Sequence, residues 1–539
     1  MKLKIGSDII KVYKDVHTWA GIVCGLMLFI AFYAGAITMF EKPLERWATP
    51  PSQLAEAPPL EDAEKLLAAV LEQYPGATRR YSIVVTPTPD QPARLVFSER
   101  GNRPRELVEY GASFAADGSL QVQRLRAAKA AQVVDRMHQY VGLPFPDPVA
   151  KAVMGVVALA YAVALLSGLI VLLPTIMKDV FALRIGNNLK RMWLDAHNAL
   201  GIFSLPFHLM IALTSVVFVF HSPFYASQEK LVYGGEIDWG THEEAPRGVA
   251  PLPASELLRR ASLQLSGFEV TSFGFQTQGD GNVEALVHGL DVRHGTRART
   301  FMRTHLDPYS GTVDVHDLPG RMEGWSEAVN AFFALHFGSF GGNTVRWLYV
   351  LMGLAGAALF YTGNLLWIEA RRRKHRGAET AMQKRSSIVL GCLTVGIALG
   401  SVAGISATIA AAKWLPAQVQ DLESWHEAIY YAVFFAAIGW AFLRGPAQGA
   451  CELLWLCAGV TLLVPVTSLA GVWGIGGAWN HARGWPVDLT ALAAAPVFVL
   501  LAWHTRRRML QGHADSVWAG AATTTTSSPR LPADSGAGT

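Results

Sequence analysis

Asp15-Val16-His17-Thr18-Trp19-Ala20-Gly21-Ile22 opens one long apolar run, and Asp195-Ala196-His197-Asn198-Ala199-Leu200-Gly201-Ile202 opens another. Both stretches read Asp-x-His-x-x-x-Gly-Ile. A histidine at the mouth of a transmembrane helix is costly unless it faces protein, water or a metal. The glycine that follows lies one turn along the same helix face and leaves room for a flat group such as a porphyrin. The two copies therefore predict two helices that each offer one imidazole, at the same depth, to one haem iron.

The composition is that of a membrane protein that also carries water-exposed segments. Hydrophobic residues make up 51% of the chain and charged residues 16%, with 16 tryptophans. The formal net charge of +4 is too small to favour binding to nucleic acid. All four cysteines fall inside apolar runs without a Cys-x-x-Cys motif, so we expect small buried side chains rather than disulfides or metal ligands.

Eight apolar segments are long enough to cross a bilayer: 17–40, 150–173, 197–221, 344–368, 387–412, 426–443, 450–472 and 487–504. Lysine and arginine gather at 2–14, 178–191, 371–385 and 506–508, which all fall on one side of an eight-span arrangement. Basic loops favour the cytoplasmic side. We therefore expect a multi-pass membrane protein with both termini in the cytoplasm.

Two long connections, 41–149 and 222–343, predict two folded modules outside the membrane, because each has a helical pattern followed by alternating strand patterns. The expected fold class is an α-helical polytopic membrane protein of about eight spans, with a pseudo-twofold repeat in the first four and two small α+β outer modules. The expected divisions are 1–40 (N-terminus and first span), 41–149 (first module), 150–221 (second and third spans), 222–343 (second module), 344–368 (fourth span), 369–386 (basic cytoplasmic loop), 387–508 (C-terminal four-span unit) and 509–539 (disordered tail).

A second repeated spacing supports the duplication. His138 precedes Met154-Gly155 by the same distance as His336 precedes Met352-Gly353, and a small pair follows in each copy, Ser167-Gly168 or Thr362-Gly363. Two parallel repeats imply a pseudo-twofold axis along the membrane normal. Such an axis pairs His17 with His197 near the inner surface and His138 with His336 near the outer surface. We expect each pair to ligate a low-spin haem b, two in all, with Gly21 and Gly201 lining the inner one.

Three other polar residues have open or simpler interpretations. His208 lies about three turns after His197, so in a continuous helix both face the same way. A buried histidine at that depth predicts a third ligand, a proton relay or a bridge between the sites, but its counterpart in the first copy is Leu28, which weakens the ligand interpretation. Asp15 and Asp195 are expected to lie at helix N-termini, where they suit the helix dipole.

The chain resembles the PepSY-associated transmembrane family, which includes bacterial inner-membrane ferric-siderophore reductases. The resemblance covers about residues 10–370 and rests on Asp15 to Trp19, Asp195 to His197, Met137 to Tyr140, Leu335 to Gly338 and the Asp307 to Gly311 turn. It implies a location in the bacterial inner membrane, PepSY-like modules in the periplasm and haem b on the helices, with His17, His138, His197 and His336 as ligands. It also implies electron transfer outward to siderophore-bound Fe(III). The four C-terminal spans depart from the four-helix form of the family and leave the acceptor open.

The leading hypothesis is therefore an oxidoreductase that conducts electrons across the membrane to a ferric siderophore or another periplasmic acceptor. The sequence has no nucleotide, flavin or zinc motif, so we expect a separate donor, either a quinol or a cytoplasmic reductase. Two alternatives remain open. One is a haem-free PepSY-type binding or regulatory membrane protein, and the other is a transporter for the siderophore or its iron.

Overall fold

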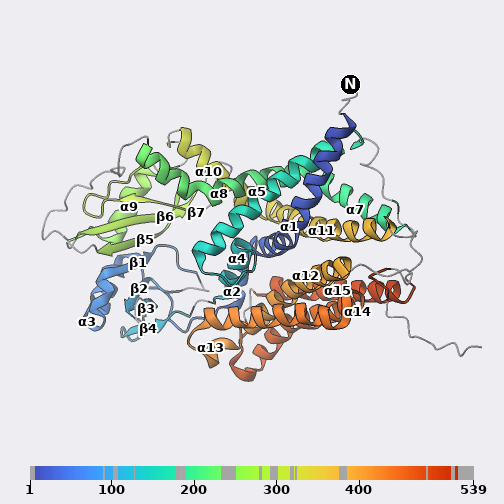
Figure 1. Ribbon diagram of the computed structural model, residues 1–539. Coiled ribbons are helices and arrows are strands. Elements are labelled where there is room, and N and C mark those ends of the chain that lie inside the picture. The colour runs from blue at the N-terminus through green and yellow to red at the C-terminus, as the bar shows by residue number, and fades with distance from the viewer. Residues whose placement is uncertain are drawn as a thin grey trace, which may run out of the picture.

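The computed structural model describes residues 6–88, 92–100, 107–126, 128–176, 184, 188–231, 250–277, 282–291, 301–315, 318, 321, 324–374, 385–480, 484–511 and 516–519. Most of the expected basic loop (375–384) and most of the expected disordered tail (520–539) lie outside the described residues. The described part is mostly helical, and one antiparallel sheet lies beyond one end of the helices (Figure 1).

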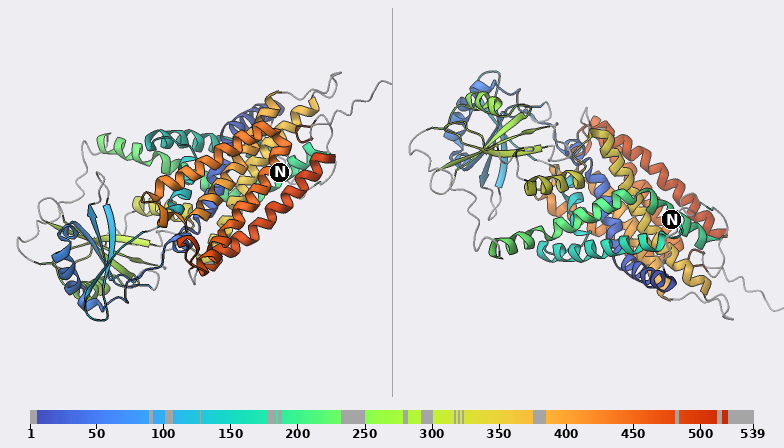
Figure 2. Two further views of the ribbon diagram at one scale, coloured as in Figure 1. Left: turned by 90° about the horizontal axis from the view of Figure 1, so that it is seen from below. Right: turned by 90° about the horizontal axis from the view of Figure 1, so that it is seen from above.

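The described helices identify a multi-pass membrane protein. Six of them are long and apolar enough to cross a bilayer: α1 (Ser7–Thr38), α5 (Asp147–Leu172), α11 (Gly342–Lys374), α12 (Arg385–Ala411), α14 (Leu422–Val472) and α15 (Trp485–Gln511). Large apolar side chains, including Trp19 and Leu443, are exposed on several of these helices. Such side chains suit contact with the hydrocarbon chains of a bilayer rather than with water. These helices run side by side, with the sheet at one end (Figure 2).

The expected span 197–221 is broken rather than continuous. It is divided between α7 (Leu189–Phe203) and α8 (Leu205–Leu231), which are bent by 69°. Pro206 explains the break, because proline has no N–H to donate and its ring clashes with the carbonyl four residues earlier. His197 and His208 therefore lie on different helices. The prediction that they share one helix face was wrong.

The helix α14 consists of two arms that fold back on each other. Gly445 has φ 75° and ψ 165°, a backbone conformation that is open almost only to glycine. A Cβ at Gly449 would lie 3.1 Å from the Cα of Ala441, which a straight helix could not allow. Pro446 begins the second arm, where its missing N–H is harmless. With α12, the short α13 (Leu415–Gln418) and α15, the arms form the C-terminal unit.

All four cysteines of the chain are buried and free, as expected from their positions in apolar runs. Three of them lie in the C-terminal unit, and Cys24 lies in α1.

The two expected outer modules share one sheet. The first supplies α3 (Ala63–Gln73), β1 (Arg80–Val84), β2 (Leu95–Arg100), β3 (Leu107–Phe114) and β4 (Leu120–Arg124), and the second supplies α9 (Ala254–Gln264), β5 (Glu269–Thr277), β6 (Val283–Leu290) and β7 (Phe301–Leu306). The strand order is β4-β3-β2-β1-β5-β6-β7, with Ser82 opposite Gly274 at the centre. Each module thereby covers an exposed edge of the other. Both helices pack on the same face, around a common core that includes Leu66, Leu257, Phe97 and Phe273.

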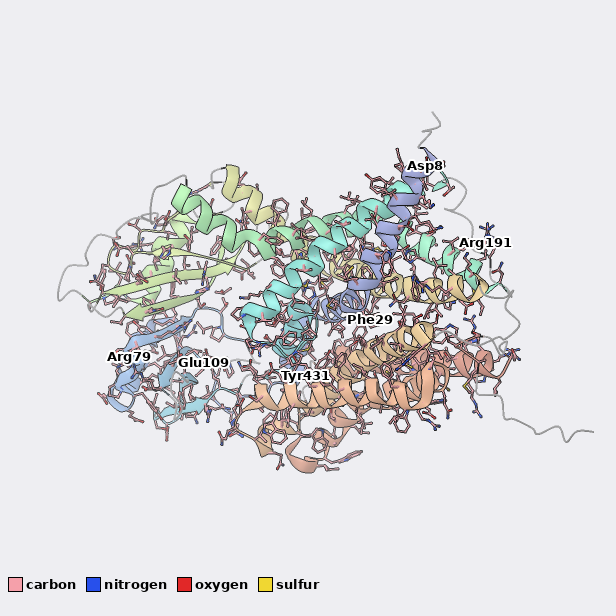
Figure 3. The ribbon with its side chains drawn as sticks, viewed as in Figure 1. Asp8, Phe29, Arg79, Glu109, Arg191 and Tyr431 are labelled. Atoms are coloured by element: carbon pink, nitrogen blue, oxygen red, sulfur yellow. The ribbon has the colours of Figure 1, made fainter. Side chains whose placement is uncertain are left out.

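Three shorter helices, α2 (Glu41–Ala48), α4 (Ala130–Tyr140) and α10 (Gly324–Phe337), lie at the end of the bundle nearest the sheet (Figure 1). Asp8 of α1 and Arg191 of α7 mark the opposite end, far from Arg79 and Glu109 beside the sheet (Figure 3). The bundle therefore has two distinct ends, and candidate ligands lie toward both.

Candidate functional site

The structure brings the four repeated histidines together in two pairs. The ring centres of His17 and His197 lie 6.1 Å apart, and those of His138 and His336 also lie 6.1 Å apart. Two imidazoles on opposite sides of one metal ion would have ring centres about 6.2 Å apart, given metal–nitrogen bonds of about 2.0 Å and roughly 1.1 Å from each nitrogen to its ring centre. The separation in each pair therefore fits a single, axially coordinated metal ion.

In the inner pair, both rings are held by backbone carbonyls of neighbouring helices. The Nδ1 atom of His17 donates to the carbonyl of Ala164 on α5 at 2.7 Å, and that of His197 donates to Leu359 on α11 at 3.1 Å. A carbonyl can only accept, so Nδ1 carries the proton and Nε2 keeps its lone pair. Metal-bound histidines usually have this arrangement, which fixes both the tautomer and the direction of the ring.

The outer pair reaches the same tautomer by a slightly different route. The Nδ1 atom of His138 donates to the carbonyl of Ala31 on α1 at 2.8 Å. The Nδ1 atom of His336 lies 2.9 Å from the hydroxyl of Thr214, which itself donates to the carbonyl of Met210 at 2.9 Å. The hydroxyl proton is thus engaged, and the oxygen accepts from the ring. Burial, with His138 close by, lowers the pKa of His336 to about 3, so this ring is neutral at physiological pH.

Glycines make the space in which three of the rings lie. A Cβ at Gly168 would lie 2.7 Å from Cε1 of His17, and one at Gly35 would lie 2.8 Å from Nδ1 of His138. At Gly363 the corresponding distance to Cε1 of His197 is 3.4 Å. Each glycine follows the accepting carbonyl by one helical turn. This explains the repeated small pairs that end in Gly168 and Gly363. Gly35 and Thr214 belong to no repeated pattern, so the sequence offered no signal for them.

The backbone at the two motif glycines has open space beside it. A Cβ at Gly21 would meet no atom within 4 Å, and one at Gly201 would meet only Cδ1 of Leu359, at 3.7 Å. A flat group can therefore lie close to the backbone at both positions. Together with two ring nitrogens held in the ligating tautomer, this is the donor set and the clearance that a bis-imidazole haem requires.

A partly open cavity with an empty volume of about 940 Å³ lies beside the outer pair. Its walls come from α1, α2, α4, α5, α8, α10 and α11 and include both His138 and His336. Glu41 and Asp135 contribute carboxylates to the wall, and burial together with the nearby carboxylates of Asp135 and Glu45 raises the pKa of Glu41.

His208 belongs to neither pair and lies between them. It is fully buried, its Nδ1 lies 2.6 Å from the hydroxyl of Tyr161, and its Nε2 has no hydrogen-bond partner among the described residues. On α5, Tyr161 comes after Ala158, which lines the outer cavity, and before Ala164, which binds His17. Of the three roles considered for His208, this position favours a bridge between the sites over a third ligand in either.

The two aspartates of the repeated motif do not cap helices. α1 begins at Ser7 and α7 at Leu189, so Asp15 and Asp195 lie more than one turn inside their helices, and the helix-dipole prediction was wrong. Asp195 is instead buried and accepts a hydrogen bond of 2.8 Å from Nε of Arg184. This ion pair holds Arg184 against the helical turn that precedes His197.

Comparison with known proteins identifies one family. The family model described as "PepSY-associated TM region" matches residues 15–370, which is more than half of the chain and includes all four paired histidines. A comparison with proteins of curated function gave no match.

Proposed function

Because the chain belongs to the PepSY-associated TM family, we propose that it is a haem b protein that passes electrons across the bacterial inner membrane to a ferric siderophore in the periplasm. One observation carries the proposal. Two repeat-related histidine pairs have the same separation of ring centres, 6.1 Å, and every Nδ1 atom in them is bonded to a protein group.

His17 and His197 would hold the inner haem, and His138 and His336 the outer one. When bound, each haem would supply reversible one-electron chemistry, with the two histidines of its site as protein ligands. The chain's own groups orient the rings through hydrogen bonds at Nδ1 and surround them with packed helices. Two ligands per site, rather than three or four, suit a planar macrocycle that provides the remaining donors. Among the described residues no group of three or more His, Cys, Asp or Glu side chains could hold a bare metal ion.

The proposed topology has eight spans, counting the bent pair of α7 and α8 as one and the two arms of α14 separately. Both termini and the basic loops then lie in the cytoplasm, and the sheet lies in the periplasm. His138 and His336 belong to α4 and α10, which lie at the end of the bundle nearest the sheet (Figure 1). His17 and His197 belong to α1 and α7, the helices of Asp8 and Arg191, which mark the opposite end (Figure 3). The two sites therefore stand at different depths, as a transmembrane electron path requires.

The proposed acceptor is siderophore-bound Fe(III), which takes one electron and becomes Fe(II). Siderophores hold iron through hard oxygen donors, which bind Fe(II) less tightly, so reduction loosens the complex. The cavity beside His138 and His336 offers a place where an acceptor could approach the outer haem. The electron would come from a quinol or from a cytoplasmic reductase.

Haem content tests the proposal directly. Protein purified from haem-replete cells should contain two haem b per chain by the pyridine haemochrome assay, and its reduced-minus-oxidised spectrum should show low-spin haem. A colourless preparation would refute the electron-transfer function and favour the haem-free binding or regulatory protein.

Proteoliposomes separate reduction from transport. With an internal reductant, the protein should produce Fe(II) outside the vesicles from added ferric siderophore, detected with a membrane-impermeant Fe(II) chelator. Labelled siderophore that accumulates inside, without external Fe(II), would identify a transporter instead.

A further inference from the structure

The helix that carries His138 is short and lies between two larger bodies. α4 has only 11 residues, and an isolated helix of this length is marginal in water. The proposed ligands of the inner site, His17 and His197, lie on α1 and α7, and α1 has 32 residues. His138 therefore depends on whatever holds α4 in place more than His17 depends on such support.

One side of α4 faces α1, where the His138 ring fits against Gly35. Another side faces the C-terminal unit. There, apolar residues of α4 pack in one cluster with α12 and α14, and the members from the two partners are Val133, Val134 and Met137 with Ile405, Tyr430 and Phe434. α4 is thus wedged between the helix that receives its histidine and the four-span unit that distinguishes this chain.

A two-pronged ion pair reinforces this contact. Arg136 donates to Glu423 at 2.6 Å and also to Glu427, and both carboxylates lie in the first two turns of α14. Tyr431, which lies on the part of α14 nearest α4, marks this contact in Figure 3. Because Arg136 is two residues before His138, the ion pair fixes α4 in rotation as well as in position.

The chain on both sides of α4 is also tied to the C-terminal unit. Before the helix, Arg126 donates to the carbonyl of Pro416 at 2.6 Å. After it, Gly142 lies so close to Tyr430 that a Cβ at this position would be 2.8 Å from the phenol oxygen. The preceding Val141 has φ 50°, a left-handed conformation that ends the helix abruptly. The segments just before and just after α4 are therefore also held against the C-terminal unit.

We propose that the C-terminal unit is a clamp that fixes α4 and so positions His138, which would bind the outer haem, with Arg136 as the positioning residue. The inference rests on the proposed function and assigns a role to the four spans that the sequence left open. It requires that weakening the Arg136 contacts loosens the outer haem and leaves the inner haem unchanged.

The test measures transfer of haem from the full-length protein, in detergent, to excess apomyoglobin. His17→Ala and His336→Ala variants assign the inner and outer phases. In Arg136→Ala, and independently in the Glu423→Gln/Glu427→Gln double variant, the outer phase should become about three- to tenfold faster while the inner phase stays unchanged. Exchanging the charges, Arg136→Glu with Glu427→Arg, should restore part of the lost retention. Lys42→Ala, which removes an exposed cation of the neighbouring α2, is the matched control and should change neither phase.

The outcomes separate this inference from its premise. A wild-type protein without haem refutes the proposed function, and the positioning role with it. A wild-type protein with two haems, whose outer phase is unchanged in both the Arg136→Ala and the double-glutamine variants, refutes only the clamp. Equal acceleration of both phases would also refute it, because it would show general loosening of the bundle.

Discussion

Adding a single methyl group at Gly168 should remove one haem and leave the other. A Cβ there would lie 2.7 Å from Cε1 and 2.8 Å from Nδ1 of His17, whereas ordinary contacts begin near 3.4 Å. The ring must therefore move by about 0.7 Å, in an interior too densely packed to absorb the change elsewhere. Metal–ligand distances tolerate only about 0.2 Å. The same movement strains the hydrogen bond from His17 to Ala164, so the combined loss is about 1–3 kcal/mol, or roughly 5- to 150-fold in haem affinity.

Gly168→Ala should thus lower the pyridine haemochrome value from two haems per chain toward one. The remaining haem should keep its low-spin spectrum, because the outer pair is untouched. The repeat supplies a matched control: Gly363→Ala places its Cβ 3.4 Å from His197, at the edge of ordinary contact, and should retain both haems. Alanine also favours a helix interior over glycine, so neither variant should unfold the protein. Two haems in Gly168→Ala would show that the ring can relocate freely, and the packing argument would be wrong.

Three other perturbations address different parts of the structure. Thr214→Val removes the hydroxyl that accepts the hydrogen bond from Nδ1 of His336, which makes this imidazole a less basic ligand. A less basic ligand stabilises Fe(III) less, so the reduction potential of the outer haem should rise in a spectroelectrochemical titration. An unchanged potential would count against this hydrogen bond. His208→Leu should keep both haems but lower the free energy of unfolding by about 1–3 kcal/mol, because the Tyr161 hydroxyl loses its hydrogen bond with Nδ1 of His208. Loss of a haem would instead identify His208 as a ligand. Burial lowers the pKa of Lys413 from 10.5 to about 8, so between these pH values the unfolded chain binds more protons than the folded chain, and this residue makes the free energy of unfolding rise with pH. Lys413→Met should therefore flatten the rise of the melting temperature with pH across that window. An equal slope of melting temperature against pH in the wild type and the variant would contradict the shift.

The sequence was sufficient to pair the four histidines. Apolar segments of bilayer length and a repeated Asp-x-His-x-x-x-Gly-Ile motif are local signals, and a duplication implies an axis that sets equivalent residues opposite each other. The juxtapositions of His17 with His197 and of His138 with His336 follow from that argument, and the structure shows both. Membership in the family was likewise visible in short motifs within residues 15–370.

Only the tertiary structure decided which groups surround these rings and how the modules join. The strands β1 and β5 are far apart in the chain, so the sequence of either strand alone does not predict that Ser82 pairs with Gly274. The role of Gly35 depends on α4 crossing α1 at that point, and the break before Pro206 changes the direction in which His208 faces. Hydrophobic periodicity specifies which face of an element is buried, but not which partner buries it. Side-chain clearance, strand pairing and ion pairs such as that of Arg136 depend on that partner, and they emerge only when the elements pack.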